Sequence, residues 1–236
     1  MNRAGRSAAA RAAVSHQHAV VHRVAALLLE YPSEELLGLL PQLRAAATEL
    51  DVAFRGPLDQ VLDHLAEHPL GQLEADYVTT FDLKRRNALY LTYYAYGDTR
   101  KRGVALVEFK QAYRAAGFEL AEAELPDHLA VVLEFAATGD RAAGIRLLLD
   151  HRAGLELLRL ALLDAGSPYA GALVAVSATL PPLAGEDRAA VAKLAAVGPP
   201  GEEVGLQPFA PPSYMPSSTT VPLPAPSFPS ATGARS

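Results

Sequence analysis

Aromatic and basic side chains alternate between Tyr77 and Gly103, in a pattern suited to binding another molecule. The stretch holds six basic residues, five tyrosines and one phenylalanine. Such a mixture can stack on the bases of single-stranded nucleic acid and contact its phosphates. A structural interpretation is stronger, because Tyr77 and Phe81 fall on one helical stripe and residues 84–86 suit an exposed connection. The other four tyrosines are expected to divide between a binding groove and the core: Tyr90, Tyr93, Tyr94 and Tyr96.

Acidic side chains gather around the start of a predicted helix that has Pro126 in its first turn. The cluster consists of Glu119, Glu122, Glu124, Asp127 and Glu134. The helix dipole favours Asp127 in a first turn whatever its function, and His128 beside it more often forms a hydrogen bond than transfers a proton. The collective charge is more informative, because an acidic rim beside an apolar groove suits a basic amphipathic helix.

Motifs for catalysis and for nucleotide or metal binding are missing from the sequence. It has no phosphate-binding glycine loop, no HExxH zinc motif and no GxSxG nucleophile elbow. It has no cysteine, which excludes disulfides, thiolate metal ligands and cysteine nucleophiles. His18 and His22 are interpreted as solvated residues near a fraying end, and His64 and His68 as favourable charges at a helix end. We therefore predict a binding protein and not an enzyme, with no metal and no cofactor.

The elements that must position these residues are helices. Apolar residues recur at helical spacing up to about residue 198, and no alternating strand pattern or internal repeat is present. Ser33 is predicted to cap a helix that kinks or breaks near Leu40 because of Pro41, and Pro57 is predicted to open the next helix. Asp140 is predicted to start a helix that runs to near Gly166, and the last helix spans roughly 186–197. The sequence thus predicts an all-α protein with a single compact multi-helix bundle.

Composition sets the expected boundaries of this bundle at residues 15–198. Residues 1–14 are predicted to be disordered. Residues 199–236 form a predicted disordered Pro/Ser-rich tail, because ten of the 18 prolines lie in these final 38 residues. The net charge of −5 argues against a nucleic-acid binder. No run approaches the ~20 apolar residues that cross a bilayer, and charged and polar residues interrupt the N-terminal apolar stretch, so we expect a cytoplasmic protein without membrane insertion.

Three segments resemble the NarJ family of nitrate reductase delta-subunit assembly chaperones. They are Leu29–Pro32 (LEYP), Tyr77–Phe118 and Glu124–Asp140 (ELPDHLAVVLEFAATGD). The first long motif is carried by Tyr77, Phe81, Asp82, Arg85, Leu89, Gly97, Arg100, Arg102, Gly103 and Ala105. The second is carried by Glu124, Leu125, Pro126, Asp127, His128 and Leu129. The sequence departs from the family at Thr80, where Leu is usual, and at Ala130, where Pro is common.

The resemblance implies a function that the residues alone do not name. Family members are helical bundles of the redox-enzyme maturation chaperone type, related to chaperones for trimethylamine-oxide and dimethyl-sulfoxide reductases. They bind the N-terminal segment of the apo catalytic α subunit of respiratory nitrate reductase and keep it competent for molybdenum cofactor insertion. They do not become part of the final enzyme. The resemblance therefore implies roles in unfolded protein binding, chaperone-mediated complex assembly and nitrate assimilation.

We place the expected client-peptide site where the aromatic and acidic residues meet. Its predicted members are Tyr77, Phe81, Tyr90, Tyr93, Tyr94, Glu119, Glu122, Glu124, Asp127 and His128. One alternative is a chaperone for a different molybdoenzyme. A more distant alternative is an RNA-binding helical regulator that uses residues 84–102.

Overall fold

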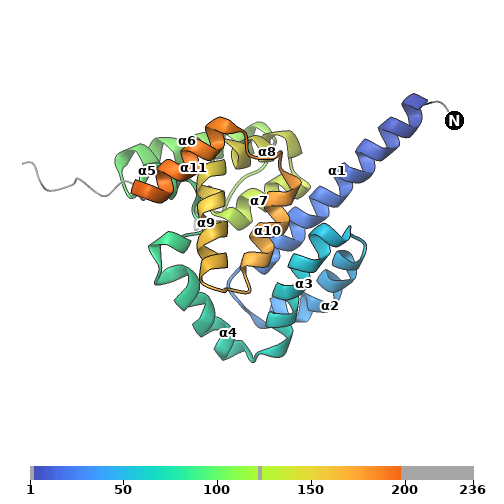
Figure 1. Ribbon diagram of the computed structural model, residues 1–236, viewed down its shortest axis with the longest axis horizontal. Coiled ribbons are helices and arrows are strands. Elements are labelled where there is room, and N and C mark those ends of the chain that lie inside the picture. The colour runs from blue at the N-terminus through green and yellow to red at the C-terminus, as the bar shows by residue number, and fades with distance from the viewer. Residues whose placement is uncertain (1–2, 122–123, 198–236) are drawn as a thin grey trace, which may run out of the picture. The chain divides into compact units, whose positions relative to one another are not determined.

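The computed structural model describes residues 3–121 and 124–197. Within these ranges every element of regular secondary structure longer than an isolated bridge is a helix. This confirms the predicted all-α class. Figure 1 shows α1 and the helices that pack around it. The α-helices are α1 (Arg3–Leu28), α2 (Glu34–Thr48), α3 (Val52–Glu67), α4 (Leu70–Tyr77), α5 (Leu91–Tyr96), α6 (Arg100–Ala115), α7 (Leu129–Thr138), α8 (Arg141–Asp150), α9 (Arg152–Asp164), α10 (Ala170–Thr179) and α11 (Gly185–Val197). Between α4 and α5 lie the π-helix η1 (Val78–Asp82) and the 3-10 helix η2 (Arg85–Asn87).

The core forms where α1, α3, α7 and α10 meet. The second half of α1 contacts α7 and α10, and α10 packs along α3. Fully buried apolar side chains from these helices fill the space between them: Val21, Ala25 and Leu28 of α1, Leu58, Val61 and Leu62 of α3, Val132 and Leu133 of α7, and Leu173 and Val176 of α10. Burial of such a continuous apolar face is the main favourable term in folding, and it fixes the helices that carry the functional residues.

Two predicted N-caps are confirmed. The Ser33 hydroxyl accepts a hydrogen bond from the Leu36 backbone N–H over 3.1 Å, and Asp140 Oδ1 accepts one from Ala143 N–H over 3.0 Å. Each side chain satisfies one of the N–H groups that the first turn of a helix leaves without a partner. The starts of α2 and α8 are thus set by local sequence.

The prolines interrupt the helices less than predicted. No break occurs at Pro41, because α2 continues through this exposed residue while Leu36 and Leu43 are buried on its other face. The predicted start of a helix at Pro57 is wrong, since α3 begins five residues earlier at Val52. Phe54 explains the extra turn, because it packs against the core and makes an edge contact with the His18 ring.

Two further expectations differ from the structure. The chain is helical from Arg3 onward, where the composition predicts a disordered start over residues 1–14. The single helix predicted after Asp140 is divided at His151 into α8 and α9. The His151 ring packs 5.1 Å from that of Phe109 at this turn, so tertiary packing decides the division. The predicted tail, residues 199–236, lies outside the described residues.

His22 is a buried link between α1 and α10 and not the solvated residue that its position suggests. Its Nε2 lies 2.8 Å from Thr179 Oγ1. Thr179 donates its hydroxyl hydrogen to the Val176 carbonyl over 2.7 Å, so His22 Nε2 must carry the proton that Thr179 accepts. Among the described residues His22 Nδ1 has no hydrogen-bond partner. Burial lowers the pKa of His22 to about 3, with smaller contributions from the charges of Arg141 and His18.

Acidification should therefore destabilise the protein through His22. Between about pH 3 and pH 6.5 the unfolded chain binds the imidazole proton and the folded chain does not, so stability falls as the pH falls. From pH 7 to pH 5 the loss from this residue is about 2 kcal/mol. Urea unfolding at several pH values should show a smaller acid loss for His22→Gln than for the wild type. His16→Gln, at an exposed position of the same helix, is the control, and an equal acid loss in all three proteins would contradict the assignment.

Candidate functional site

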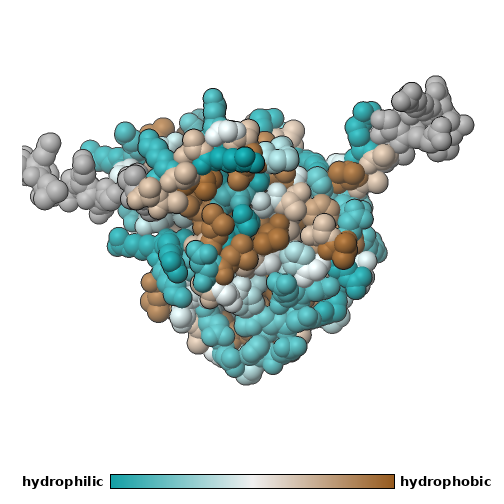
Figure 2. Space-filling model, in the orientation of Figure 1, coloured by the Kyte–Doolittle hydropathy of each residue, from teal (hydrophilic) through white to brown (hydrophobic). Residues whose placement is uncertain are grey.

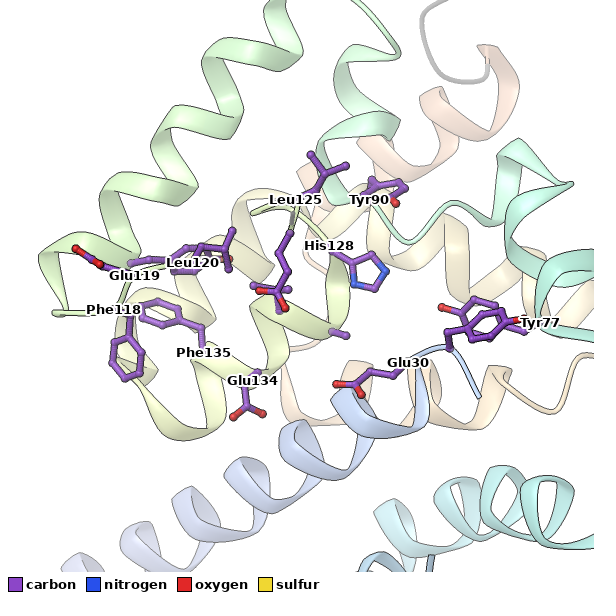
Figure 3. Close-up of a pocket in the computed structure, with 15 residues that line it drawn as sticks. Glu30, Tyr77, Tyr90, Phe118, Glu119, Leu120, Leu125, His128, Glu134 and Phe135 are labelled. Atoms are coloured by element: carbon purple, nitrogen blue, oxygen red, sulfur yellow. The ribbon is translucent and has the colours of Figure 1, made fainter. Parts of the chain in front are cut away.

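Two adjoining cavities, with volumes of about 630 and 440 Å³, share Tyr31, Tyr77, Tyr90 and His128. We call the continuous surface that they form the aromatic groove, and Figure 3 shows its larger part. The larger cavity is lined by Glu30, Tyr31, Tyr77, Tyr90, Tyr113, Phe118, Glu119, Leu120, Glu124, Leu125, His128, Ala130, Val131, Glu134 and Phe135. The smaller is lined by Tyr31, Tyr77, Phe81, Asp82, Arg85, Ala88, Leu89, Tyr90, Tyr93, Asp98, Arg102 and His128.

A pairing of two chain segments builds the middle of the groove. Tyr90 and His128 form an isolated antiparallel bridge, in which Leu91 N–H donates to the Asp127 carbonyl over 3.0 Å and Leu129 N–H to the Leu89 carbonyl over 2.7 Å. The Tyr90 and His128 rings meet edge to face with their centroids 5.4 Å apart. These bonds place the two long motifs of the sequence side by side.

The π-helix η1 sets the position of the aromatic residues at the end of α4. Leu83 N–H donates to the carbonyl of Val78, five residues earlier, over 3.0 Å. The Tyr77 and Phe81 rings lie 4.7 Å apart, and the Tyr77 hydroxyl donates to the Leu29 carbonyl over 2.9 Å. Single π turns within helices are frequent at functional sites. Here the wide turn joins the groove residues Tyr77, Phe81 and Asp82 to the loop that follows α1.

Asp127 lies beneath the groove and not on its rim. It is fully buried and precedes α7, which begins at Leu129, so the predicted place in a first helical turn is corrected. Its Oδ2 accepts hydrogen bonds from Thr92 Oγ1 over 2.5 Å and from Thr92 N–H over 3.3 Å, and lies 3.5 Å from Arg102 Nη2. The carboxylate therefore fastens α5 and α6 to the segment before α7, and it offers no exposed surface at the groove.

Tyr94 also belongs to the interior. Its hydroxyl donates towards the carbonyls of Arg86 and Ala88 over 2.9 and 3.0 Å, and it lines neither cavity. A Cβ added at Gly154 would stand 2.8 Å from Tyr94 Cβ, so α9 approaches this ring closely. Tyr94 is therefore a packing residue, which corrects its predicted place among the client contacts. Burial raises the pKa of its hydroxyl.

The structure brings most of the other predicted client residues to the groove. Tyr77, Phe81, Tyr90, Tyr93, Glu119, Glu124 and His128 all line one or both cavities. Glu122 lies outside the described residues. Three large apolar residues that are not among the predicted client residues add exposed surface: Tyr31 is 49% exposed, Phe118 42% and Leu125 42%. Exposed apolar side chains that gather around one cavity mark a binding surface. The LEYP segment could have pointed to Tyr31, because it is one of the segments that carry the family resemblance. Nothing in the sequence showed that the Tyr31 ring would lie 5.3 Å from the Tyr77 ring.

The larger cavity is acidic. Glu30, Glu119, Glu124 and Glu134 line it, and of the described residues that line it only His128 can carry a positive charge. Glu134 forms an ion pair with Arg23 of α1. Burial raises the pKa of Glu30, with the charge of Arg23 opposing this rise and that of Glu124 adding to it. The predicted acidic rim thus lies beside the aromatic surface, although Glu30 comes from a distant part of the sequence.

The smaller cavity carries mixed charge. Arg102 forms an ion pair with Asp98 over 3.2 Å, and its guanidinium lies 5.2 Å from the centre of the Tyr90 ring. Asp82 and Arg85 complete the charged lining. A cation over an aromatic face is an additional attraction. Arg102 therefore holds both Tyr90 and the buried Asp127 in place.

Four other residues of the two long motifs lie outside the lining of the groove. Gly97 ends α5 with φ 56° and ψ −153°, a backbone conformation open essentially to glycine alone. The Pro126 carbonyl accepts a hydrogen bond from the Tyr113 hydroxyl over 2.6 Å. Arg100 is exposed in the first turn of α6. Nothing in the structure explains Gly103, where an added Cβ would meet open space.

The groove has the character of a binding surface, because exposed apolar side chains and carboxylates line it together. Burial lowers the pKa of His128, although Asp127 partly opposes this, and no hydrogen bond holds its imidazole within the described ranges. Residues 3–121 and 124–197 contain no group of three acidic or histidine side chains placed to hold a metal. In the same ranges no helix has the length and apolar character to span a membrane.

Comparison with known proteins agrees with the geometry. The family model for the nitrate reductase delta subunit matches residues 47–175, more than half of the chain. The nitrate reductase-like protein NarX of Mycobacterium tuberculosis is 41% identical over 160 residues, which cover 68% of this chain and 24% of NarX. A Bacillus subtilis protein named as the nitrate reductase molybdenum cofactor assembly chaperone NarJ is 37% identical over 114 residues, covering 48% of this chain and 62% of that one.

A solved redox enzyme maturation protein from Archaeoglobus fulgidus superposes with a TM-score of 0.48 at 21% identity, covering 75% of this chain and 93% of that one. The aligned region spans less than two thirds of NarX and of the Bacillus subtilis protein. The family match runs from the end of α2 to α10 and includes both segments that the Tyr90–His128 bridge joins. The chain belongs to the nitrate reductase delta subunit family.

Proposed function

We propose that this protein is a cytoplasmic assembly chaperone for respiratory nitrate reductase. It binds the catalytic α subunit before the molybdenum cofactor is inserted, keeps that subunit competent for insertion, and is not part of the final enzyme. Family membership and the name of the Bacillus subtilis relative support this role. The observation that carries the proposal is the aromatic groove with its acidic larger cavity. The protein acts by binding and not by catalysis.

The groove suits the N-terminal segment of the α subunit as a basic amphipathic helix. Tyr31, Phe118 and Leu125 offer exposed apolar surface to the apolar side of such a helix. Glu119 and Glu124 are exposed at the same cavity, where they can attract its Lys and Arg side chains. Helices that bind in grooves use apolar anchors for affinity, and complementary charges give orientation and faster association.

Calorimetric titration with a synthetic peptide of the α-subunit N-terminus tests the proposal. The wild type should bind it, and the double variant Glu119→Gln/Glu124→Gln should bind about three- to tenfold more weakly. This follows from the loss of two exposed charge interactions of about 0.2–1 kcal/mol each. The variant's affinity should also depend less on salt concentration, because two attractive charges have been removed.

Glu49→Gln/Glu67→Gln is the matched control, since it removes two exposed carboxylates that do not line the groove. Its affinity for the peptide should equal that of the wild type. An N-terminal peptide from a different molybdoenzyme, titrated in parallel, distinguishes the alternative client. Absence of wild-type binding at high micromolar peptide would overturn the proposed recognition. Equal affinities in both double variants would reject the acidic part of it.

A further inference from the structure

The first part of α1 projects from the bundle. Figure 1 shows it extending beyond the other helices, and Figure 2 shows hydrophobic surface where it leaves the bundle. Residues 10–14 are exposed, and Val14 among them is 54% exposed. Within the described part of the chain, the first side-chain hydrogen bond from another element to α1 is at Ser15, whose hydroxyl accepts from Arg141 Nη1 over 2.6 Å. Short helical segments without packing are only marginally stable in water, so this segment has surface to offer a partner.

The charge of this segment is positive. Residues 1–29 contain four arginines and no acidic residue, although the whole chain has a net charge of −5. Arg3 and Arg6 belong to the first turn of α1, which has no acidic residue, and the N-terminal end of a helix dipole is itself positive. Arg11 is exposed on the same segment. Carboxylates of a partner would compensate the arginines and the dipole together.

The larger cavity of the aromatic groove presents the complementary surface. Glu119 and Glu124 are exposed at this cavity, and exposed apolar side chains stand beside them. Such a surface suits a helix that combines apolar and basic side chains, and the first part of α1 has both. Its apolar side chains are mostly alanine, with Val14 the largest. Because small side chains bury little area, the contact should be weak and reversible.

The projecting segment cannot enter the cavity of its own copy. α1 is continuous from Arg3 to Leu28, and Glu30 follows its end at the cavity. At about 1.5 Å per residue, Arg11 lies about 25 Å along the helix axis from Leu28 and about 18 Å from Arg23, which pairs with the lining residue Glu134. Figure 3 shows α1 passing below Glu30 and Glu134 and running on away from the labelled residues. The segment is therefore available to another molecule.

A second copy of this chain fits the segment, because each copy carries both halves of the contact. When two copies exchange the same element about a two-fold axis, the contact is made twice and the assembly closes. We propose that this protein forms a reciprocal dimer, in which residues 3–14 of each copy lie in the larger cavity of the other. The charges of Arg6 and Arg11 are then compensated by Glu119 and Glu124 of the second copy. This dimer covers the surface proposed for the client, but its formation does not depend on that role.

Sedimentation velocity of the full chain, without any client peptide, tests the dimer. The wild type should change from monomer to dimer as its concentration rises to high micromolar, and salt should raise the dimer Kd because exposed charges are screened. Arg6→Gln/Arg11→Gln and Glu119→Gln/Glu124→Gln should each raise this Kd about tenfold, since every lost contact occurs twice. A wild type that stays monomeric at low salt would overturn the proposal.

Arg146→Gln/Arg188→Gln is the matched control, because it removes two exposed arginines that lie on α8 and α11. Its dimer Kd should equal that of the wild type. An equal rise in Kd for this control and for Arg6→Gln/Arg11→Gln would mean that the net charge of the chain, and not α1, governs association. That result would also overturn the proposal.

Reversed charges test which two surfaces meet. Arg6→Glu/Arg11→Glu gives a copy in which both surfaces are acidic, and Glu119→Arg/Glu124→Arg gives one in which both are basic. Each variant alone should stay monomeric because like charges repel. An equimolar mixture should form a heterodimer, since each segment of α1 then meets a cavity of opposite charge. All four substitutions are at the projecting segment or at exposed positions of the rim, so folding should be unaffected. A mixture that stays monomeric would overturn the pairing of α1 with the groove.

Discussion

Asp127→Ala is expected to lower the free energy of unfolding by about 3–5 kcal/mol, the cost of removing one partner of a buried ion pair. The substitution leaves the Thr92 backbone N–H without its acceptor and Arg102 without its buried counter-charge. Because Asp127 precedes α7 while Thr92 and Arg102 lie on α5 and α6, the loss should loosen three elements together. Urea denaturation followed by circular dichroism measures the change.

Two further substitutions isolate the cause of this loss. Asp127→Asn keeps the shape of the side chain and one acceptor oxygen, so its cost should be smaller than that of Ala. Glu124→Ala removes a nearby exposed carboxylate and should change the stability by no more than about 0.5 kcal/mol. If Asp127→Ala unfolds at the same urea concentration as Glu124→Ala, Asp127 does not fasten these helices.

Gly171→Ala is expected to destabilise the fold by about 3 kcal/mol or more, at the upper end of the cost of overfilling a core. A Cβ at this position would stand 2.0 Å from the Pro57 carbonyl oxygen and 3.2 Å from Val61 Cγ2. The first contact is with backbone, which cannot rotate away, so α10 and α3 would have to separate along their shared surface. Thermal unfolding should show a Tm lowered by several degrees.

Gly38→Ala on α2 is the matched control, because this exposed helical glycine is not followed by proline and an added Cβ meets nothing within 4 Å there. The same chemical change should then stabilise the protein by about 0.4–1 kcal/mol, since alanine restricts the unfolded chain and favours helix. Opposite signs for the two substitutions are the expected result. Two changes of the same sign would mean that helix propensity, and not close contact, governs Gly171.

Features fixed by neighbouring residues could be predicted from the sequence. Helical spacing gave the all-α class, and Ser33 and Asp140 cap the helices that they were expected to cap. The effects of Pro41 and Pro57 were overestimated, because packing on the buried sides of α2 and α3 outweighs a local preference. Tertiary contacts commonly override such preferences. The residues at which helices begin and end were thus harder to predict than the presence of the helices.

In the candidate site, the sequence did not show which side chains face the groove and which face the core. Tyr90 and Tyr94 read alike in the sequence, yet one lines the groove and the other hydrogen-bonds inside the fold. Asp127 has the charge of its acidic neighbours, but its side chain points to Thr92. The direction of a side chain outside regular spacing depends on which segments meet. For the same reason the sequence did not predict that Glu30 would line the larger cavity together with Glu124.

The bridge between Tyr90 and His128 makes one part of the groove more rigid than the rest. Two backbone hydrogen bonds hold the segments around Tyr90 and His128 side by side, so these segments resist sliding past each other. The other walls contain loops: Glu30 and Tyr31 follow α1, and Phe118 to Leu120 follow α6, where no regular secondary structure is formed. The groove therefore has a stiff floor and compliant sides. On the proposed function, the loops would accommodate peptides of different thickness, while the floor would keep one fixed register for their apolar anchors.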